Sequence, residues 1–89
     1  MDSQRLDLWL FYARFAKSRQ LCSQYIEKGH MHLNRQRVTK NHAKIRIGDV
    51  LTFPSPATPS IVRVWRVEKL GLRRGPAPEA SQLYREIHE

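Results

Sequence analysis

The segment 4–16 constrains the fold most, because it is apolar on both sides of the helix that its spacing predicts. One stripe at helical spacing consists of Leu6, Trp9, Leu10 and Ala13. The opposite side carries Leu8, Phe11, Tyr12 and Phe15. A helix that is apolar all round is usually buried on two sides. We therefore expect a strand or a helix from the second half of the chain to cover the far face. The alternative is an exposed apolar patch that binds a partner protein.

A second helix is expected almost directly after the first. Ser18 suits the N-cap, the helix should run to about Lys28, and Gly29 suits the left-handed residue that ends it. The inner stripe of this helix is predicted to be Leu21, Cys22, Tyr25 and Ile26. The joint is essentially Lys17-Ser18, so the two helices should pack closely.

The rest of the chain favours short strands. Alternation over 30–33 and around Val38 predicts a hairpin with a turn at Asn34-Arg35-Gln36. Further strands are expected around Ile45 and Ile47, over 50–53, and over 61–67, where β-branched and aromatic residues predominate. Residues 70–78 read as a loop. A final helix is predicted to begin near Pro78, with a stripe of Ala80, Leu83, Tyr84 and Ile87.

This order of elements predicts a small α+β protein: two packed N-terminal helices, an antiparallel sheet and a short C-terminal helix. The segment 53–59 holds three prolines and no charge, which indicates a loop. We divide the chain there into 1–53 and 54–89. A chain of 89 residues has little room for a second core, so the second part should complete the same small domain.

Positive charge is concentrated in the first half. The chain has 16 Lys and Arg against 8 Asp and Glu, a net charge of +8, and residues 1–53 hold ten basic and four acidic side chains. Four of the basic residues surround the first helix and the joint: Arg5, Arg14, Lys17 and Arg19. Ser18 and the free N–H groups of a helix start favour an anion at the same place. Arg37 and Lys40, with Arg35 nearby, add charge on the hairpin. Such a surface suits the phosphates of folded nucleic acid.

Other chemistries have weak support in the sequence. His30, His32, Cys22 and His42 do not form the paired spacing of a zinc site, and Cys22 is expected to be a small buried residue. No phosphate-cradling glycine loop and no paired carboxylates suggest catalysis. Trp65 is expected in the core. A single cysteine and the lack of a secretory signal or a long apolar run predict a cytoplasmic protein that does not enter membranes.

The order of several residues resembles the S4-like RNA-binding domain. The residues that carry the likeness are Arg5-Leu6-Asp7, Leu10, Ala13-Arg14-Phe15, Ser18-Arg19, Ile26, Gly29, Leu33-Asn34, Val38 and Gly48-Asp49-Val50. Within that group the chain is most similar to the small ribosome-associated heat-shock proteins. Further matches are Leu8-Trp9-Leu10, Arg73-Arg74, residues 76–80 and Leu83-Tyr84. The chain departs from the family at Arg35, where a glycine usually follows the asparagine of the turn.

The resemblance implies a bent sheet after the two helices and a non-catalytic protein that binds structured RNA: rRNA, the ribosomal subunit or tRNA. It assigns contacts with RNA to Arg5, Lys17, Ser18, Arg19, Arg37 and Lys40, with Arg14 in support. Asp7 is expected to orient one of these arginines, because phosphate repels a carboxylate. Residues 1–53 would form the S4-like unit. No cofactor or metal is expected, and a monomer is favoured.

Two other functions stay open at this point. Two helices on a short joint also suggest a helix-turn-helix, in which Gln20 and Gln24 face the groove of duplex DNA. Alternatively, the apolar first helix docks a partner protein. A competition between structured RNA and duplex DNA at one salt concentration separates the first alternative from RNA binding.

Overall fold

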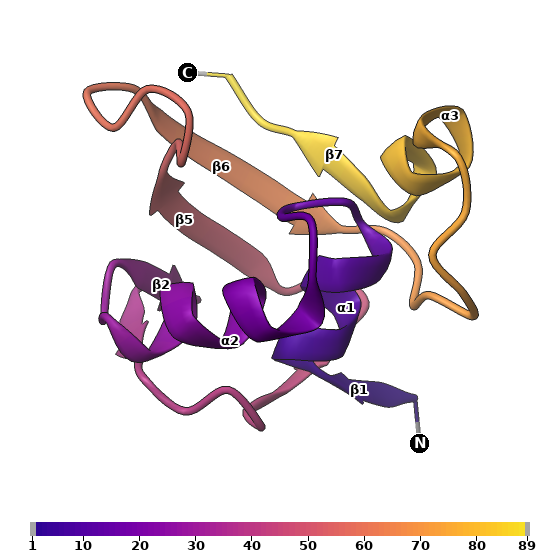
Figure 1. The fold of residues 1–89 in the computed structure, drawn as a ribbon, viewed down its shortest axis with the longest axis horizontal. Helices are drawn as coiled ribbons and strands as arrows, with labels where there is room; N and C mark the ends of the chain where they lie inside the picture. The colour runs from indigo at the N-terminus through magenta and orange to yellow at the C-terminus, as the bar shows by residue number, and fades with distance from the viewer. Residues whose placement is uncertain (1, 89) are drawn as a thin grey trace.

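The computed structural model describes residues 2–88, in which helices pack on one face of an antiparallel sheet (Figure 1). The helices of that layer are α1 (Leu6–Tyr12) and α2 (Arg19–Glu27). The strands of the five-stranded sheet are β2 (Met31–Leu33), β3 (Gln36–Val38), β5 (Val50–Pro54), β6 (Val62–Val67) and β7 (Tyr84–Glu86), in the order β3-β2-β5-β6-β7. A separate pair joins β1 (Ser3–Arg5) to β4 (Lys44–Arg46). The α+β class predicted from the sequence is confirmed.

The core lies between the two helices and the sheet. Strand alternation turns Leu51 and Phe53 of β5 toward the helices, and Val50 and Thr52 away from them. The other fully buried side chains include Leu6, Trp9, Leu10, Cys22, Ile26, Met31, Ile45 and Val67. Trp65 is 7% exposed, so its predicted place in the core is confirmed. Cys22 is also buried as predicted, and burial raises the pKa of its thiol to about 11.

The far face of α1 is covered by the second half of the chain, as predicted, but by a loop segment and not by a strand or a helix. Gly71 lies against Tyr12, since a Cβ added there would be 2.5 Å from Cδ2 of the Tyr12 ring. The guanidinium carbon of Arg74 lies 4.9 Å from the centroid of the Phe11 ring. These contacts come from the segment between β6 and α3 (Ala77–Ala80), which runs alongside α1 (Figure 1). The alternative of an exposed docking helix is therefore not favoured.

The first helix is shorter than the predicted range of 4–16. Residues 3–5 pair with β4, and hydropathy spacing gives no sign of such a distant partner. At the other end, Phe15 N–H donates to the carbonyl of Leu10, and Arg14 N–H to that of Phe11. Arg14 has φ of 61°, so this is a Schellman ending with arginine at the position that glycine usually occupies.

The second helix confirms the predicted caps but not the whole inner stripe. The hydroxyl of Ser18 accepts a hydrogen bond from Leu21 N–H at 3.1 Å, and Gly29 has φ of 78°. Cys22 and Ile26 face the core, whereas Leu21 is 46% exposed. The predicted inward position of Leu21 is wrong because the buried stripe of α2 is narrow, and Leu21 lies at its margin.

The predicted hairpin turn is confirmed, with two residues at its tip. Asn34 and Arg35 have φ of 51° and 72°, the positive values that a type I′ turn requires. Side-chain hydrogen bonds fix Asn34, whose Oδ1 accepts from Val50 N–H at 2.9 Å and whose Nδ2 donates to Asp49 at 3.1 Å. The turn therefore forms with arginine in place of the usual glycine.

The final helix predicted from the sequence is wrong beyond residue 83. Helix α3 ends at Ala80, a 3₁₀ turn spans Ser81–Leu83, and β7 then pairs with β6. The ring of Tyr84 stacks on Trp65 with centroids 3.7 Å apart. The free edge of β6 offers hydrogen bonds to this segment, and local spacing along the chain cannot reveal that edge.

Candidate nucleic-acid interface

The start of α2 brings together groups that favour an anion. Ser18 has an extended backbone and caps the helix, so the N–H groups of the first turn point out of the helix end. The partial positive charge of the helix start adds to the charge of Arg19, the first residue of α2. Hydroxyl, backbone donors and guanidinium thus lie within one turn of chain.

A buried carboxylate ties two of the predicted RNA-binding arginines to each other. Asp7 is 2% exposed. Arg5 donates to it from Nε at 3.2 Å and from a terminal nitrogen at 3.1 Å, and Arg19 donates from Nε at 3.3 Å. Ser23 Oγ and Leu8 N–H complete the cluster at 3.1 Å and 2.8 Å. The predicted role of Asp7 in orienting an arginine is confirmed, and it extends to Arg5 and Arg19 together.

The environment of Asp7 keeps its carboxylate charged. Burial by itself raises its pKa, but the hydrogen bonds from Arg5 and Ser23 and the charges of Arg19 and Arg5 outweigh burial. The pKa of Asp7 is therefore held below its ordinary value of 3.8. The side chains of Arg5 and Arg19 are 42% and 44% exposed, so each guanidinium is fixed on one side and open to solvent on the other.

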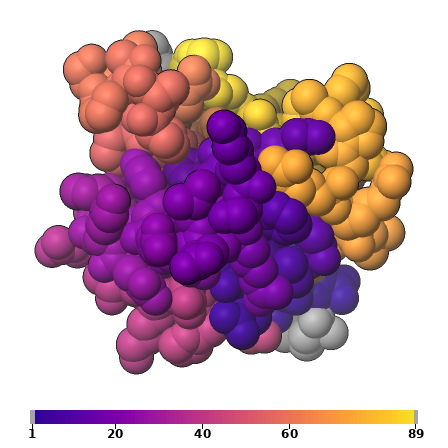
Figure 2. Space-filling model, viewed as in Figure 1, coloured from indigo at the N-terminus to yellow at the C-terminus, as the bar shows by residue number. Residues whose placement is uncertain are grey.

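Arg37, on the hairpin, is anchored to the end of α2. Its Nε donates to the carbonyl of Gly29 at 3.0 Å. A Cβ added at Gly29 would lie 2.9 Å from that Nε, so the guanidinium rests directly on the glycine. Lys17 and Lys40 are exposed. Figure 2 shows α2 and the joint at the centre of one face, with residues of the hairpin and the following loop beside and below them.

Gly29→Ala is expected to lower the free energy of unfolding by about 1–2 kcal/mol, because a side chain is strained at this positive φ and displaces Arg37. Urea denaturation measures the change. Gly48→Ala is the matched control, since Gly48 also has positive φ but nothing lies within 4 Å of an added Cβ. Gly29→Ala should be the more destabilising of the two. Equal losses would contradict the role of the contact with Arg37.

Arg14 differs from the other predicted contacts. Its Nε donates to the carbonyl of Gly75 at 2.9 Å, so its guanidinium is held by the C-terminal segment and not by Asp7. The sequence placed Arg14 inside a first helix expected to reach residue 16, close to Lys17, but α1 has already ended at Tyr12. Sequence reasoning also missed Ser23, which completes the Asp7 cluster from the next turn of α2.

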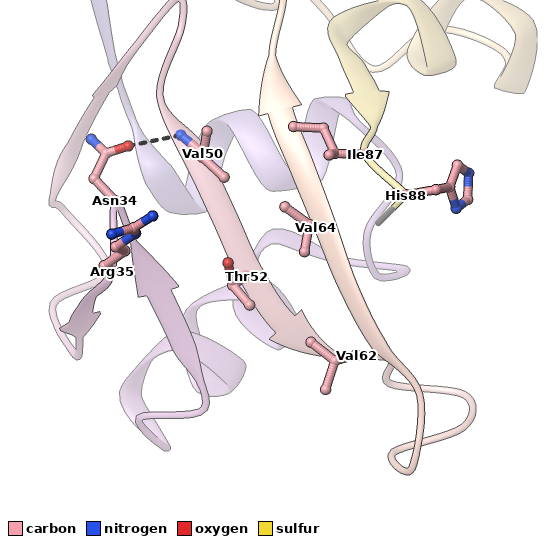
Figure 3. A pocket seen from close by; sticks show the side chains of 8 residues that line it. All are labelled: Asn34, Arg35, Val50, Thr52, Val62, Val64, Ile87 and His88. Atoms are coloured by element: carbon pink, nitrogen blue, oxygen red, sulfur yellow. Dashed lines mark hydrogen bonds between the residues drawn. The ribbon is translucent and has the colours of Figure 1, made fainter.

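The opposite face of the sheet has a different character. A hollow of about 730 Å³ there is lined by aliphatic side chains of β5 and β6 together with Ile87 (Figure 3). Arg35 lies on one side of it and His88 on the other (Figure 3). The one ring in its lining is the imidazole of His88, and the Asp7 cluster does not line it. Of the cations near the joint and on the hairpin, Arg35 alone lines this hollow.

No helix within residues 2–88 is both long and apolar enough to cross a bilayer. Within the same residues, no three side chains of the His, Cys, Asp and Glu types are grouped so that they would hold a metal ion.

Comparison with known proteins was made for the whole chain. The family model described as S4 domain matches residues 4–51. Heat shock protein 15 of Escherichia coli K12 is 38% identical over 85 residues, which cover 96% of this chain and 61% of that protein. The homologue from Haemophilus influenzae is 37% identical over 82 residues, covering 92% and 60%. The chain thus spans less than two thirds of these relatives.

A solved structure is similar as well. A trimeric structure of Vibrio cholerae heat shock protein 15 aligns with a TM-score of 0.85 and 38% identity. The alignment covers 97% of this chain and 83% of that one. The two helices and the antiparallel sheet are therefore arranged as in that protein.

Proposed function

The chain belongs to the S4 domain family, and on this premise we propose that it is a non-catalytic protein that binds structured RNA, such as rRNA in a ribosomal subunit or tRNA. The observation that carries the proposal is the pair of arginines held by Asp7 beside the start of α2. A fixed guanidinium loses little conformational freedom when it binds phosphate, and it offers two parallel donors. The similarity to heat shock protein 15 supports the same class of function.

The proposed RNA site has two parts. Arg5, Ser18 and Arg19 receive one phosphate group, and Lys17 lies next to them in the joint. Arg37 and Lys40 contact the next part of the RNA backbone, on the hairpin side of α2. Arg14 supports this surface from the C-terminal segment. Counterion release at these cations would supply much of the affinity.

The shape of the surface favours structured RNA over duplex DNA. Gln20 and Gln24 are exposed on α2, as a groove-reading helix would need. However, the hairpin lies beside α2 and shares its face, so α2 does not protrude alone (Figure 2). A broad surface of this kind fits the shallow minor groove and backbone of folded RNA.

The two parts of the chain would act as one unit in this function. We assign the RNA contacts to residues 1–53, and residues 54–89 complete the same sheet through β6 and β7. The monomer expected from the sequence stays a prediction, and the trimer of the Vibrio cholerae protein makes light scattering the direct test.

The double variant Arg19→Ala/Lys40→Ala is expected to bind structured RNA about 10- to 100-fold more weakly, because each side chain is assigned to a phosphate. The slope of log affinity against log salt should fall by about 2 units. Fluorescence anisotropy with a labelled rRNA hairpin at several salt concentrations measures both quantities. A competition with duplex DNA at one salt concentration tests the choice of nucleic acid.

The matched control is Lys69→Ala/Arg85→Ala, which also removes one lysine and one arginine. Both residues are exposed and neither belongs to the proposed surface. This control should keep most of the affinity at moderate salt, where distant charges are screened. If the two double variants lose affinity equally, RNA responds to net charge alone and the assigned surface is wrong.

A further inference from the structure

We propose that the RNA site includes a cleft that receives one unstacked nucleobase, between the helix joint and the C-terminal segment. The cleft has a volume of about 380 Å³. Its main lining residues are Arg14, Phe15, Phe53, Arg63, Trp65 and Tyr84. This inference rests on the proposed function and adds to it the chemical class of group that binds next to the phosphates.

Aromatic rings form the floor of the cleft. The ring centroids of Phe15 and Phe53 are 5.2 Å apart, and those of Phe53 and Trp65 are 5.0 Å apart. Tyr84 lies flat on Trp65 with an interplanar angle of 9°. Phe15 and Tyr84 are only partly buried, so each keeps some ring surface toward the solvent. Bases of single-stranded RNA stack on rings of this kind.

The C-terminal segment lines the cleft with small side chains. These are Ala77, Ala80 and Ser81, from α3 and the turn that follows. Small side chains leave more room for a flat group than large ones would. The volume also lies within the range of ordinary ligand pockets, which is about 300–1,000 Å³.

Two arginines give the cleft its charge. Arg63 donates to Glu86 at 2.8 Å and its side chain is 44% exposed. Arg14 uses Nε for the carbonyl of Gly75, which leaves its terminal nitrogens available for a ligand. Arg14 also keeps a positive φ that disfavours residues other than glycine, and strained residues of this kind cluster at binding sites. Both guanidinium groups suit a phosphate or a base edge.

The position of the cleft fits a continuous strand of RNA. Phe15 lies only three residues before Ser18, so their Cα atoms are within about 11 Å of each other. In Figure 2 the proline loop and α3 rise on two sides of the helix joint, with part of β7 visible between them. A nucleotide whose phosphate binds at Ser18 and Arg19 would therefore have the cleft within reach of itself or its neighbour.

The hollow on the outer face of the sheet is a poorer candidate for a base. Its walls are valine, threonine and isoleucine side chains, with Arg35 and His88 at the sides (Figure 3). The ring among these is the imidazole of His88 at one side, whereas the cleft beside the joint offers the larger, partly exposed rings of Phe15 and Tyr84, backed by the buried rings of Phe53 and Trp65. The nucleobase is therefore assigned to the cleft.

The two tryptophan side chains supply a test with an internal control. Trp65 lines the cleft and its indole N–H donates to Glu86 at 3.1 Å, whereas Trp9 does not line the cleft and its indole N–H donates to Lys69. Adenosine 5′-monophosphate is titrated into ¹⁵N-labelled protein, with ribose 5-phosphate and inorganic phosphate as probes that lack a base. We expect the nucleotide to shift the Trp65 indole signal with at least about fivefold higher affinity than either probe, since stacking contributes about 5- to 150-fold.

A cleft-filling variant sharpens the test. Ala77 is exposed and lines the cleft, so Ala77→Leu should fill the cleft without disturbing the core. The affinity for the nucleotide should fall at least about fivefold. Gln82→Leu is the matched control, because Gln82 is exposed nearby but does not line the cleft. It should bind the nucleotide as the unmodified chain does.

The outcomes separate the two proposals. If RNA binds and depends on Arg19 and Lys40, but the nucleotide leaves the Trp65 signal unmoved, the cleft proposal is overturned and the proposed function stands. Equal effects of the nucleotide and ribose 5-phosphate also overturn it, since the base then contributes nothing. If the nucleotide shifts Trp65 but structured RNA does not bind, the cleft stands as a nucleotide site and the proposed function fails.

Discussion

Trp9→Ala is expected to lower the free energy of unfolding by about 3–5 kcal/mol, a large part of the stability of a domain this size. The side chain is fully buried, and its ring lies edge-on to Trp65 with centroids 6.4 Å apart. It is also one of the contacts through which α1 holds the C-terminal segment, by the hydrogen bond to Lys69. Removing it opens a cavity between the two halves of the chain. Thermal unfolding followed by circular dichroism should show a fall in Tm of at least about 12 °C.

Two companion variants show which part of Trp9 matters. Trp9→Phe keeps a ring in the core but leaves the Lys69 carbonyl without its donor, so a loss of about 1–2 kcal/mol is expected. Leu72→Ala removes a side chain that is 95% exposed and should change stability by less than about 0.5 kcal/mol. If Trp9→Ala unfolded no more easily than Leu72→Ala, the packing of α1 against the C-terminal segment would be wrong.

Asp7→Asn is expected to lower the free energy of unfolding at pH 7 by about 2–3 kcal/mol, after allowance for the partial exposure of its arginine partners. Both carboxylate oxygens of Asp7 act as hydrogen-bond acceptors, and every group around them is a donor. An asparagine of the same shape places an amide donor against these donors and also removes the negative charge between Arg5 and Arg19. Urea denaturation at pH 7 measures the loss.

The same residue predicts a pH dependence. Because the folded-state pKa of Asp7 is lowered, its contribution is fully present above the ordinary value of 3.8 and is lost as the pH falls through the folded-state pKa. The unmodified chain should therefore lose more stability between pH 5 and strongly acidic pH than Asp7→Asn loses. A parallel fall in both proteins would contradict this linkage.

Glu79→Gln is the control for Asp7→Asn. Glu79 pairs with Arg73 at 3.2 Å, but the two side chains are 48% and 70% exposed. An ion pair in solvent contributes little, so a change below about 1 kcal/mol is expected. The difference between the two variants isolates the effect of burying Asp7.

Local signals in the sequence were sufficient to predict the structure wherever that structure depends on residues close together in the chain. Ser18 and Gly29 mark the ends of α2 because capping needs only the adjacent backbone groups. The turn at Asn34 and Arg35 is likewise marked by two residues and the strands beside them, and the hydrogen bonds of Asn34 with Asp49 and Val50 then add support from farther along the chain. The cationic residues near the joint could be grouped from the sequence for the same reason, since they lie close together along the chain.

Prediction failed where distant segments compete for the same residues. The spacing of Leu83, Tyr84 and Ile87 fits a helix, but the edge of β6 and the ring of Trp65 draw residues 84–86 into a strand. Residues 3–5 are taken into the pair with β4 in the same way. In the candidate site, Arg14 was assigned to one cluster by its spacing, whereas Gly75 holds it in another place.

The class of the fold, the apolar helix that must be covered on both sides, and the cations available for a polyanion could all be inferred from the residues alone. Each of these is a property of composition or of spacing within a few residues. Folding was needed to show that Asp7 holds two arginines, that Arg14 contacts the C-terminal segment, and that aromatic rings from both halves line one cleft. Those arrangements depend on contacts between separate elements, from Asp7 with Arg19, 12 positions apart, to Arg14 with Gly75, 61 positions apart, and local propensity carries no information on such pairs.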